Sequence, residues 1–129
     1  MTITVEDKTP GYKVQNSVDL DFDRETITVE ELISRRVQTE VAEYNKNKNE
    51  VFSGLVQPGE SEKLLNGYRM KKAREIDAEK QCYLALDAFQ KNGYFVIIDD
   101  KQVSSLKEEI ALRPGISVTF IKLMPLVGG

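Results

Sequence analysis

The end of the sequence combines an alternating segment with a short tail that stops at two glycines. Residues 116–123 alternate, with Ile116, Val118 and Phe120 on one side, and a period of two is typical of a half-buried strand. Residues 124–129 are too few to form an element of their own, and at ~3.3 Å per residue they would extend ~20 Å beyond a sheet. The sequence therefore predicts a strand followed by an extended tail that presents a free carboxylate.

The two final glycines have a chemical use in such a tail. Because Gly128 and Gly129 lack a Cβ, they let an extended backbone pass through a narrow channel into the active site of another protein. Chance is one alternative, since at roughly 7% glycine per position the pair would end about 0.5% of random chains. A truncated chain or a frayed end is another. The pair gains weight because it follows a strand and a short apolar tail.

Size and charge indicate an ordinary soluble globular protein. The chain of 129 residues is long enough for one domain with its own core. With 18 basic and 21 acidic side chains it would on average be repelled by phosphate backbones, so we expect no nucleic acid partner. The sequence contains neither a run of ~18 apolar residues nor a signal peptide, so we expect no membrane association. Cys82 is the only cysteine, which fits a reducing cytoplasm.

The first third predicts a hairpin followed by a helix. Alternating runs at residues 2–5 and 18–23 favour two strands. Thr28 and Glu31 form a capping box, and Ile27 before the cap can pack on Leu32. Helical spacing predicts a buried stripe that consists of Val29, Leu32, Ile33, Val37, Val41 and Tyr44. A helix of this kind needs a sheet to cover.

The pattern weakens in the middle and returns towards the end. Residues 45–74 contain several glycines and a proline, which predicts loops with one short turn of helix or strand. A second helix is expected from Asp77, its N-cap, to Gln90, closed by Asn92 and Gly93.

The apolar run at residues 94–98 is typical of a strand buried on both faces. Residues 99–101 predict the turn after it. Residues 104–110 predict one short helical turn, with Leu106 and Ile110 pointing inward.

Four acidic side chains near the first helix suggest a metal site, but they have a simpler interpretation. Asp19, Asp21, Asp23 and Glu30 have the spacing of a calcium loop, but Arg24 stands where such a loop needs glycine. We therefore expect a solvated strand face and no metal.

Catalysis by this chain itself has little support. Cys82 would need a polarising partner, and the chain has no histidine, so we interpret it as a core residue. Asp99 and Asp100 are adjacent in a turn, where two carboxylates rarely converge on one substrate. We expect no catalytic residue.

The order of these segments resembles the ubiquitin-like β-grasp fold. "TVEELISRRV" lies where that fold has its main helix, "FVIIDDKQV" is similar to ubiquitin's third strand and the turn after it, and "SVTFIKLMPLVGG" is similar to its last strand and tail. The similarity covers residues 2–45 and 94–129. It implies one α+β domain over residues 1–129, a β-grasp with a mixed sheet packed on a main helix. Residues 46–93 would be an insertion carrying the second helix, and residues 124–129 a flexible C-terminal tail.

The resemblance also implies that the protein is a substrate and not an enzyme, without a cofactor of its own. An E1-like adenylating enzyme would use ATP to activate the Gly129 carboxylate, and an E2-like enzyme and a JAB-type metallopeptidase would be further partners. Gly128 and Gly129 would be the reactive end. The residues expected to dock on the activating enzyme are Pro125, Leu126 and Val127, with Leu123 and Met124 as an apolar patch beside them.

The tail leaves the type of chemistry open. Ubiquitin has basic residues before its glycines, whereas residues 124–127 are apolar and include Pro125, similar to the sulfur carriers of thiamine and molybdopterin synthesis. Such a carrier would form a C-terminal thiocarboxylate. A noncovalent β-grasp interaction module is a third hypothesis. Conjugation to target proteins is favoured because a chain of this length exceeds what a minimal sulfur carrier requires.

Overall fold

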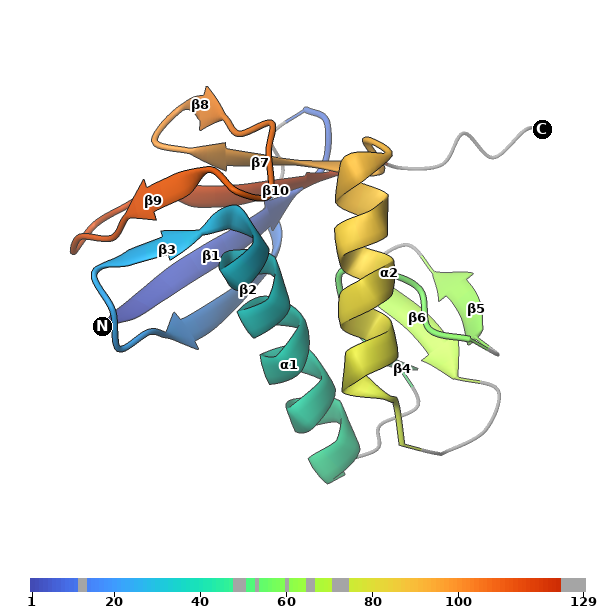
Figure 1. The fold of residues 1–129 in the computed structure, drawn as a ribbon. Coiled ribbons are helices and arrows are strands. Elements are labelled where there is room, and N and C mark those ends of the chain that lie inside the picture. The colour runs from blue at the N-terminus through green and yellow to red at the C-terminus, as the bar shows by residue number, and fades with distance from the viewer. Residues whose placement is uncertain are drawn as a thin grey trace.

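The computed structural model describes residues 1–11, 14–47, 51–52, 54–59, 61–64, 67–70 and 75–123. A five-stranded sheet with two helices on one side forms the main body (Figure 1). Its strands, in the spatial order β2-β1-β10-β7-β8, are β1 (Thr2–Lys8), β2 (Val14–Asp21), β7 (Tyr94–Ile98), β8 (Lys101–Gln102) and β10 (Val118–Lys122).

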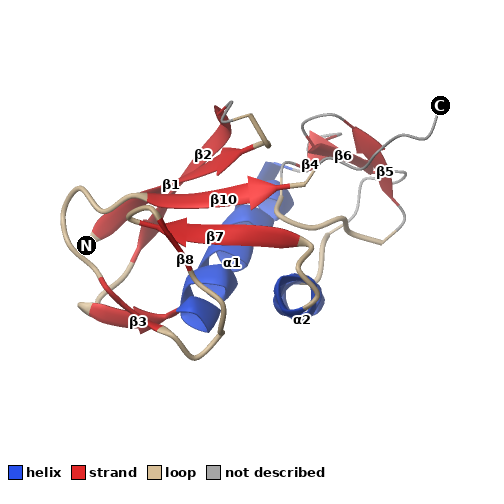
Figure 2. Ribbon diagram, turned by 90° about the horizontal axis from the view of Figure 1, so that it is seen from above, coloured by secondary structure: helices blue, strands red, loops and turns tan. Residues whose placement is uncertain are grey.

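The sheet is mixed. The central strand β10 runs parallel to β1, and every other neighbouring pair is antiparallel. The first helix, α1 (Val29–Asn47), crosses one face of the sheet (Figure 2). An α+β fold with a mixed sheet on a main helix is thus confirmed, as is the N-terminal hairpin of β1 and β2.

The start of α1 is built as its sequence predicts. The Glu31 N–H donates to Thr28 Oγ1 at 3.2 Å, and the Thr28 N–H donates back to Glu31 Oε1 at 3.4 Å, which completes the capping box. All six residues of the predicted stripe are buried, as are Ile27 before the cap and Phe22 after β2. The stripe packs against inward residues of the sheet, which include Ile3, Val5, Val96, Val118 and Phe120.

The structure corrects two predictions in the second half. Residues 94–98 are buried on one face only, since Tyr94 and Val96 are buried while Phe95 and Ile97 are half-buried. Residues 104–110 match the expected short helical turn only in part: the Glu108 N–H donates to the Ser105 carbonyl oxygen at 3.2 Å in a single turn, but Glu109 and Ile110 belong to β9 (Glu109–Ala111), which pairs with β3 (Thr26–Thr28).

A tertiary contact explains the second difference. The carbonyl oxygens of Leu106 and Glu108 accept the first N–H groups of α1, from Glu30 and Val29, both at 3.0 Å. These N–H groups have no partner inside the helix, and the loop before β9 lies against the start of α1 and satisfies them. The predicted turn after β7 is confirmed, because Asp99 and Asp100 have φ of 46° and 69°, typical of the tight turn between two antiparallel strands.

The segment between α1 and β7 is more regular than predicted. The loops expected there are partly a small sheet in the order β4-β6-β5, with bounds β4 (Val51–Phe52), β5 (Ser61–Leu64) and β6 (Gly67–Met70). Strands of two to four residues carry too little alternation to be recognised locally. The second helix, α2 (Ala78–Gln90), is confirmed: Asp77 caps it by accepting the N–H groups of Glu79 and Lys80.

Of the helices in the described part of the chain, none combines the length and apolar character needed to cross a bilayer.

Candidate functional site

The end of β10 is the described point nearest in sequence to the predicted tail. Leu123 follows β10 directly and leaves 44% of its surface exposed. The remaining predicted site residues, Met124, Pro125, Leu126, Val127, Gly128 and Gly129, lie outside the described residues, so their roles stay predictions.

The end of β10 is held in place on several sides. The strand lies between β1 and β7, and Lys122 pairs with Tyr94. Lys122 Nζ also donates to the carbonyl oxygen of Gly54 at 3.0 Å and lies 5.8 Å from the ring centroid of Tyr68. These contacts tie β10 to the small sheet, so the chain leaves the main sheet at Leu123 from a fixed position.

The strand register places an apolar patch beside this exit. Phe95 and Ile121 are direct partners across β7 and β10, and Ile97 pairs with Thr119 on the same face. Their sequence neighbours Val96 and Phe120 point towards α1 and are fully buried, so Phe95, Ile97 and Ile121 lie on the opposite face. We call Phe95, Ile97, Ile121 and Leu123 the outer-face patch.

The sequence predicted only part of this patch. Leu123 was expected beside the tail, and the alternation of residues 116–121 already placed Ile121 opposite the buried positions. Phe95 and Ile97 are not predicted, because a continuous apolar run over residues 94–98 does not distinguish the two faces of the strand. Leu123 is the one predicted docking residue that the structure locates.

A buried cluster of charges lies on the α1 side of the sheet. Arg36 of α1 has no exposed surface and donates to both carboxylate oxygens of Asp7 on β1, with an Nη2–Oδ2 distance of 2.6 Å. Its Nε donates to Glu40, whose other oxygen accepts the Leu55 N–H at 2.9 Å. The guanidinium carbon lies 4.6 Å from the ring centroid of Phe120. The buried cluster thus connects β1, α1, β10 and the segment that follows β4.

Burial and pairing act in opposite directions on these groups. Burial is the largest effect on Glu40 and raises its pKa, although Arg36 opposes it. Burial lowers the pKa of Arg36, but the attraction of Glu40 and Asp7 outweighs it, so the net pKa is raised and the guanidinium stays charged. Because these groups are shut away from solvent, we interpret the cluster as a structural connection.

The cysteine and the turn carboxylates do not form a reactive site. Cys82 is half-buried with Sγ 3.7 Å from the Ser34 carbonyl oxygen, and burial raises the pKa of its thiol, which disfavours a nucleophilic thiolate. Asp99 accepts the Ser117 N–H at 3.0 Å and pairs with Arg113, and these contacts lower the pKa of Asp99. Its carboxylate stabilises the turn between β7 and β8.

The acidic residues of β2 form a solvated strand face, as expected. Asp19 accepts a hydrogen bond from the Thr4 hydroxyl at 2.7 Å, and Asp21 accepts one from Thr2, across the hairpin. Within the described ranges, no group of three or more His, Cys, Asp or Glu side chains is placed to hold a metal ion.

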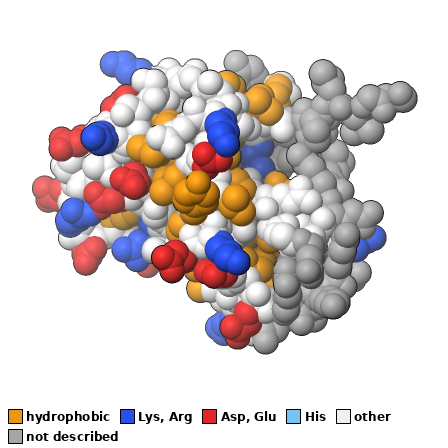
Figure 3. All heavy atoms as spheres, turned by 45° about the vertical axis from the view of Figure 1, so that its right-hand side comes forward, with side chains coloured by type: hydrophobic (Ala, Val, Ile, Leu, Met, Phe, Trp, Pro, Cys, Tyr) orange, Lys and Arg blue, Asp and Glu red, His pale blue; other side chains and the backbone are white. Residues whose placement is uncertain are grey.

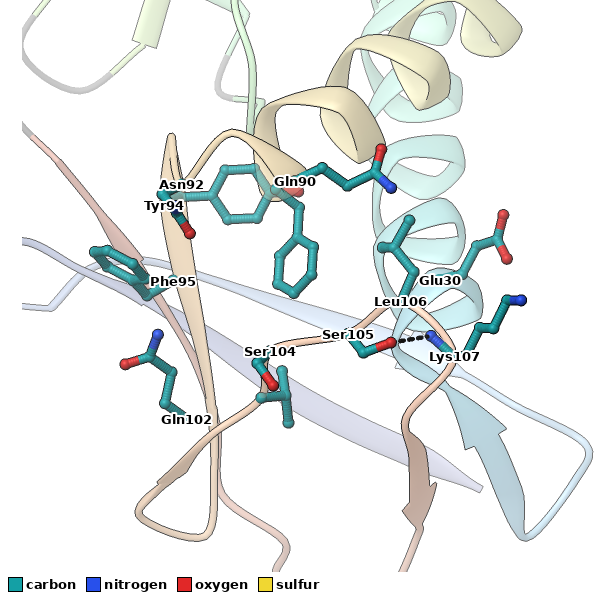
Figure 4. A pocket seen from close by; sticks show the side chains of 12 residues that line it. Glu30, Gln90, Asn92, Tyr94, Phe95, Gln102, Ser104, Ser105, Leu106 and Lys107 are labelled. Carbon is teal, nitrogen blue, oxygen red and sulfur yellow. Dashed lines mark hydrogen bonds between the residues drawn. The ribbon is translucent and has the colours of Figure 1, made fainter.

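A groove of about 570 Å³ opens between the end of α2, the start of β7 and residues 103–107 (Figure 4). The residues that line it include Phe89 and Tyr94 together with Ser104 and Ser105. The Tyr94 hydroxyl donates to the Ala85 carbonyl oxygen at 2.6 Å, so it faces the core, and burial raises its pKa. The groove can accept a mixed polar and apolar ligand, and its Ser105 hydroxyl oxygen accepts the Lys107 backbone N–H at 3.2 Å.

Comparison with known proteins gave no match to a family model, to a curated protein or to a solved structure.

Proposed function

We propose that this chain is a ubiquitin-like modifier that is attached to other proteins through Gly129. The observation that carries the proposal is the strand order β2-β1-β10-β7-β8, with β1 and β10 parallel in the middle and α1 across one face. This arrangement is similar to that of the ubiquitin-like β-grasp fold and therefore supports the proposal. In it the last strand is central, and its end leads into the segment that carries Gly128 and Gly129.

The chemistry requires Gly129 to carry a free carboxylate, either as the chain end or after cleavage behind it. One carboxylate oxygen attacks the α-phosphate of ATP, which releases pyrophosphate and leaves a glycyl adenylate on the E1-like enzyme. An enzyme thiolate then attacks the acyl carbon and releases AMP. An amine of the target protein finally displaces the thiol and forms an amide. Glycine suits each step because it has no side chain to obstruct the acyl carbon.

The outer-face patch supports this role. It provides an apolar surface of one exposed and three half-buried side chains beside the exit at Leu123, and the buried core of an interface is more apolar than its rim. The end of β10 is also anchored, so the tail starts from a fixed point relative to this surface. An activating enzyme that holds the patch would therefore receive the carboxylate in a defined direction. We place this activity in the cytoplasm, with E2-like and JAB-type partners.

Sulfur transfer is the second candidate. The apolar residues 124–127 with Pro125 favour it, because they are similar to the tails of sulfur carriers. Adenylation would be the same, but a sulfur donor would replace AMP and leave a thiocarboxylate on Gly129.

One experiment separates these functions. The chain is incubated with ATP, magnesium and the E1-like enzyme encoded nearest to its gene, and its intact mass is measured with and without a sulfur donor. A thioester or amide adduct supports the modifier, and a mass gain of one oxygen-to-sulfur exchange identifies a carrier. A variant that lacks Gly129 should give neither. No ATP-dependent change in the intact chain would contradict both and favour a noncovalent interaction module.

A further inference from the structure

The solvent-facing side of α2 carries two large apolar side chains. Tyr83 leaves 70% of its surface exposed and Leu84 leaves 41%. One turn before them lies the exposed Lys80, and one turn after them lies Asp87. We call Lys80, Tyr83, Leu84 and Asp87 the α2 outer face. Figure 3 shows an apolar area in the middle of this side of the molecule, with charged side chains above and below it.

The orientation of α2 is fixed, so these side chains cannot turn inward. On the opposite side of the helix, Gln81, Ala85 and Phe89 are buried. The Gln81 side chain donates to the Val56 carbonyl oxygen at 3.3 Å, and the Ala85 carbonyl oxygen accepts the Tyr94 hydroxyl. The helix therefore uses one side for the core and presents the other as a rigid surface.

The α2 outer face carries a positive charge at one end, Lys80, and a negative charge at the other, Asp87, so two copies of it are complementary in antiparallel orientation. We propose that two copies of this chain associate by packing α2 against α2 in antiparallel orientation. A two-fold axis between Tyr83 and Leu84 places Lys80 of each copy opposite Asp87 of the other and brings the four apolar side chains together at the centre. An interface of this symmetry uses the same surface on both copies, so one short sequence supplies both halves.

The existing contacts of Asp87 are compatible with this pairing. Its carboxylate accepts Lys91 Nζ at 2.8 Å within the same helix, and its side chain is 36% exposed. A carboxylate has two oxygens and about four acceptor positions, so it can bind Lys80 of the second copy as well.

The size of the surface predicts a weak dimer. α2 has 13 residues, and one face of such a helix buries less than the roughly 1,200–2,000 Å² of a standard stable interface. We therefore expect association that depends on concentration, with a Kd in the range of about 10 μM to about 1 mM. The pairing does not depend on any chemistry at Gly129.

Sedimentation equilibrium over about that concentration range tests the proposal. The average mass of the full chain should rise from that of one chain towards that of two. Leu84→Glu should abolish the rise, whereas the control Val14→Glu, at another exposed apolar residue on β2, should retain it. A chain that stays monomeric at the upper limit, or a Leu84→Glu variant that associates like the parent, would overturn the proposal.

Charge reversal tests the orientation. Lys80→Glu places Glu opposite Asp87 twice, and Asp87→Lys places Lys opposite Lys80 twice, so each variant alone should associate about tenfold more weakly. A mixture of the two variants restores both attractive pairs and should dimerise as the parent does. Circular dichroism checks that both variants stay folded. Failure of the mixture to associate more tightly than either variant alone would overturn the antiparallel pairing.

Discussion

Arg36 is the side chain on which the interior depends most directly. It is fully buried and is the only cation in contact with two buried carboxylates, Asp7 and Glu40, in the described structure. Replacing it by Met keeps much of its volume but leaves both carboxylates without their partner. We expect Arg36→Met to lower the free energy of unfolding by about 3–5 kcal/mol, measured by urea denaturation.

The neighbouring Arg35 provides the control. Its side chain is exposed and its guanidinium lies 5.8 Å from the Phe22 ring centroid. Arg35→Met therefore removes the same group from the same helix without leaving a buried carboxylate unpaired. We expect a loss of at most about 1 kcal/mol. Equal losses in the two variants would contradict the importance of the buried cluster.

Glu40 predicts a pH dependence of stability with a defined sign. Its pKa in the folded chain is raised above the usual 4.5. At pH values between 4.5 and this raised pKa, the folded state therefore binds more protons than the unfolded state. Its contribution to stability is therefore present at low pH and is lost as pH rises through the folded pKa. Asp99, whose pKa is lowered, loses its contribution only as pH falls below about 3.8, outside this window.

Glu40→Gln removes this titration and keeps the side-chain size. We expect the free energy of unfolding of the parent, minus that of the variant, to be larger at about pH 5 than at about pH 7. Urea denaturation at both pH values measures it. The opposite order would mean that Arg36 outweighs burial at Glu40.

At positions 36 and 40, helical spacing favours burial, whereas the charged residue type favours exposure. Arg36 and Glu40 fall within the buried side of α1, each next to a predicted stripe residue, Val37 and Val41. Only apolar residues define the predicted stripe, so the sequence pattern does not predict that these two charged positions are buried. Their burial depends on Asp7 in another strand, which no local pattern contains.

At the scale of elements, the outer-face patch next to the end of β10 makes the proposed function testable. Ile121→Glu and Leu123→Glu place a charge on the surface that we expect the activating enzyme to cover. Each should reduce the rate of the ATP-dependent adduct by about tenfold or more, as loss of a central apolar contact does. Val14→Glu, on the far edge strand β2, should react like the parent.

Asn45 connects α1 to the segment that leads into α2. Its side-chain amide donates to the Ile76 carbonyl oxygen at 3.0 Å and accepts the Ile76 N–H at 2.8 Å. We expect Asn45→Ala to destabilise the fold by about 1–3 kcal/mol, because it leaves two backbone groups without partners. Hydrogen exchange should accelerate in α2 more than in β1 and β10. A uniform acceleration would mean that Asn45 acts on the whole fold.

Elements with a local signal were predicted and those defined by pairing were not. Capping residues marked α1 and α2, and alternation marked β1, β2 and β10. The small sheet and the β3–β9 pair have strands of two to four residues, whose existence depends on a distant partner. The same holds for the candidate site. Alternation predicts that Ile121 faces away from the core, whereas only the sheet register shows that Phe95 and Ile97 lie on the same face.

At the scale of the whole molecule, the segment between α1 and β7 shares the core of the sheet. Phe52, Leu55, Tyr68 and Phe89 belong to the same buried apolar cluster as residues of β1 and β10. Leu55 also donates the hydrogen bond that satisfies one oxygen of Glu40. Residues 46–93 are therefore expected to contribute to the stability of the main sheet, although the ubiquitin-like resemblance treats them as an insertion.

This shared core predicts a single unfolding transition. Chains with one contiguous core usually unfold without populated intermediates, so different probes should report the same midpoint. Far-UV circular dichroism follows all elements, while NMR signals of α2 and of β10 follow the two parts separately during urea denaturation. We expect the three midpoints to agree within error. If α2 unfolds at a lower urea concentration than β10, the segment is a separate unit added to a self-sufficient sheet and helix, and its removal should leave the chemistry at Gly129 intact.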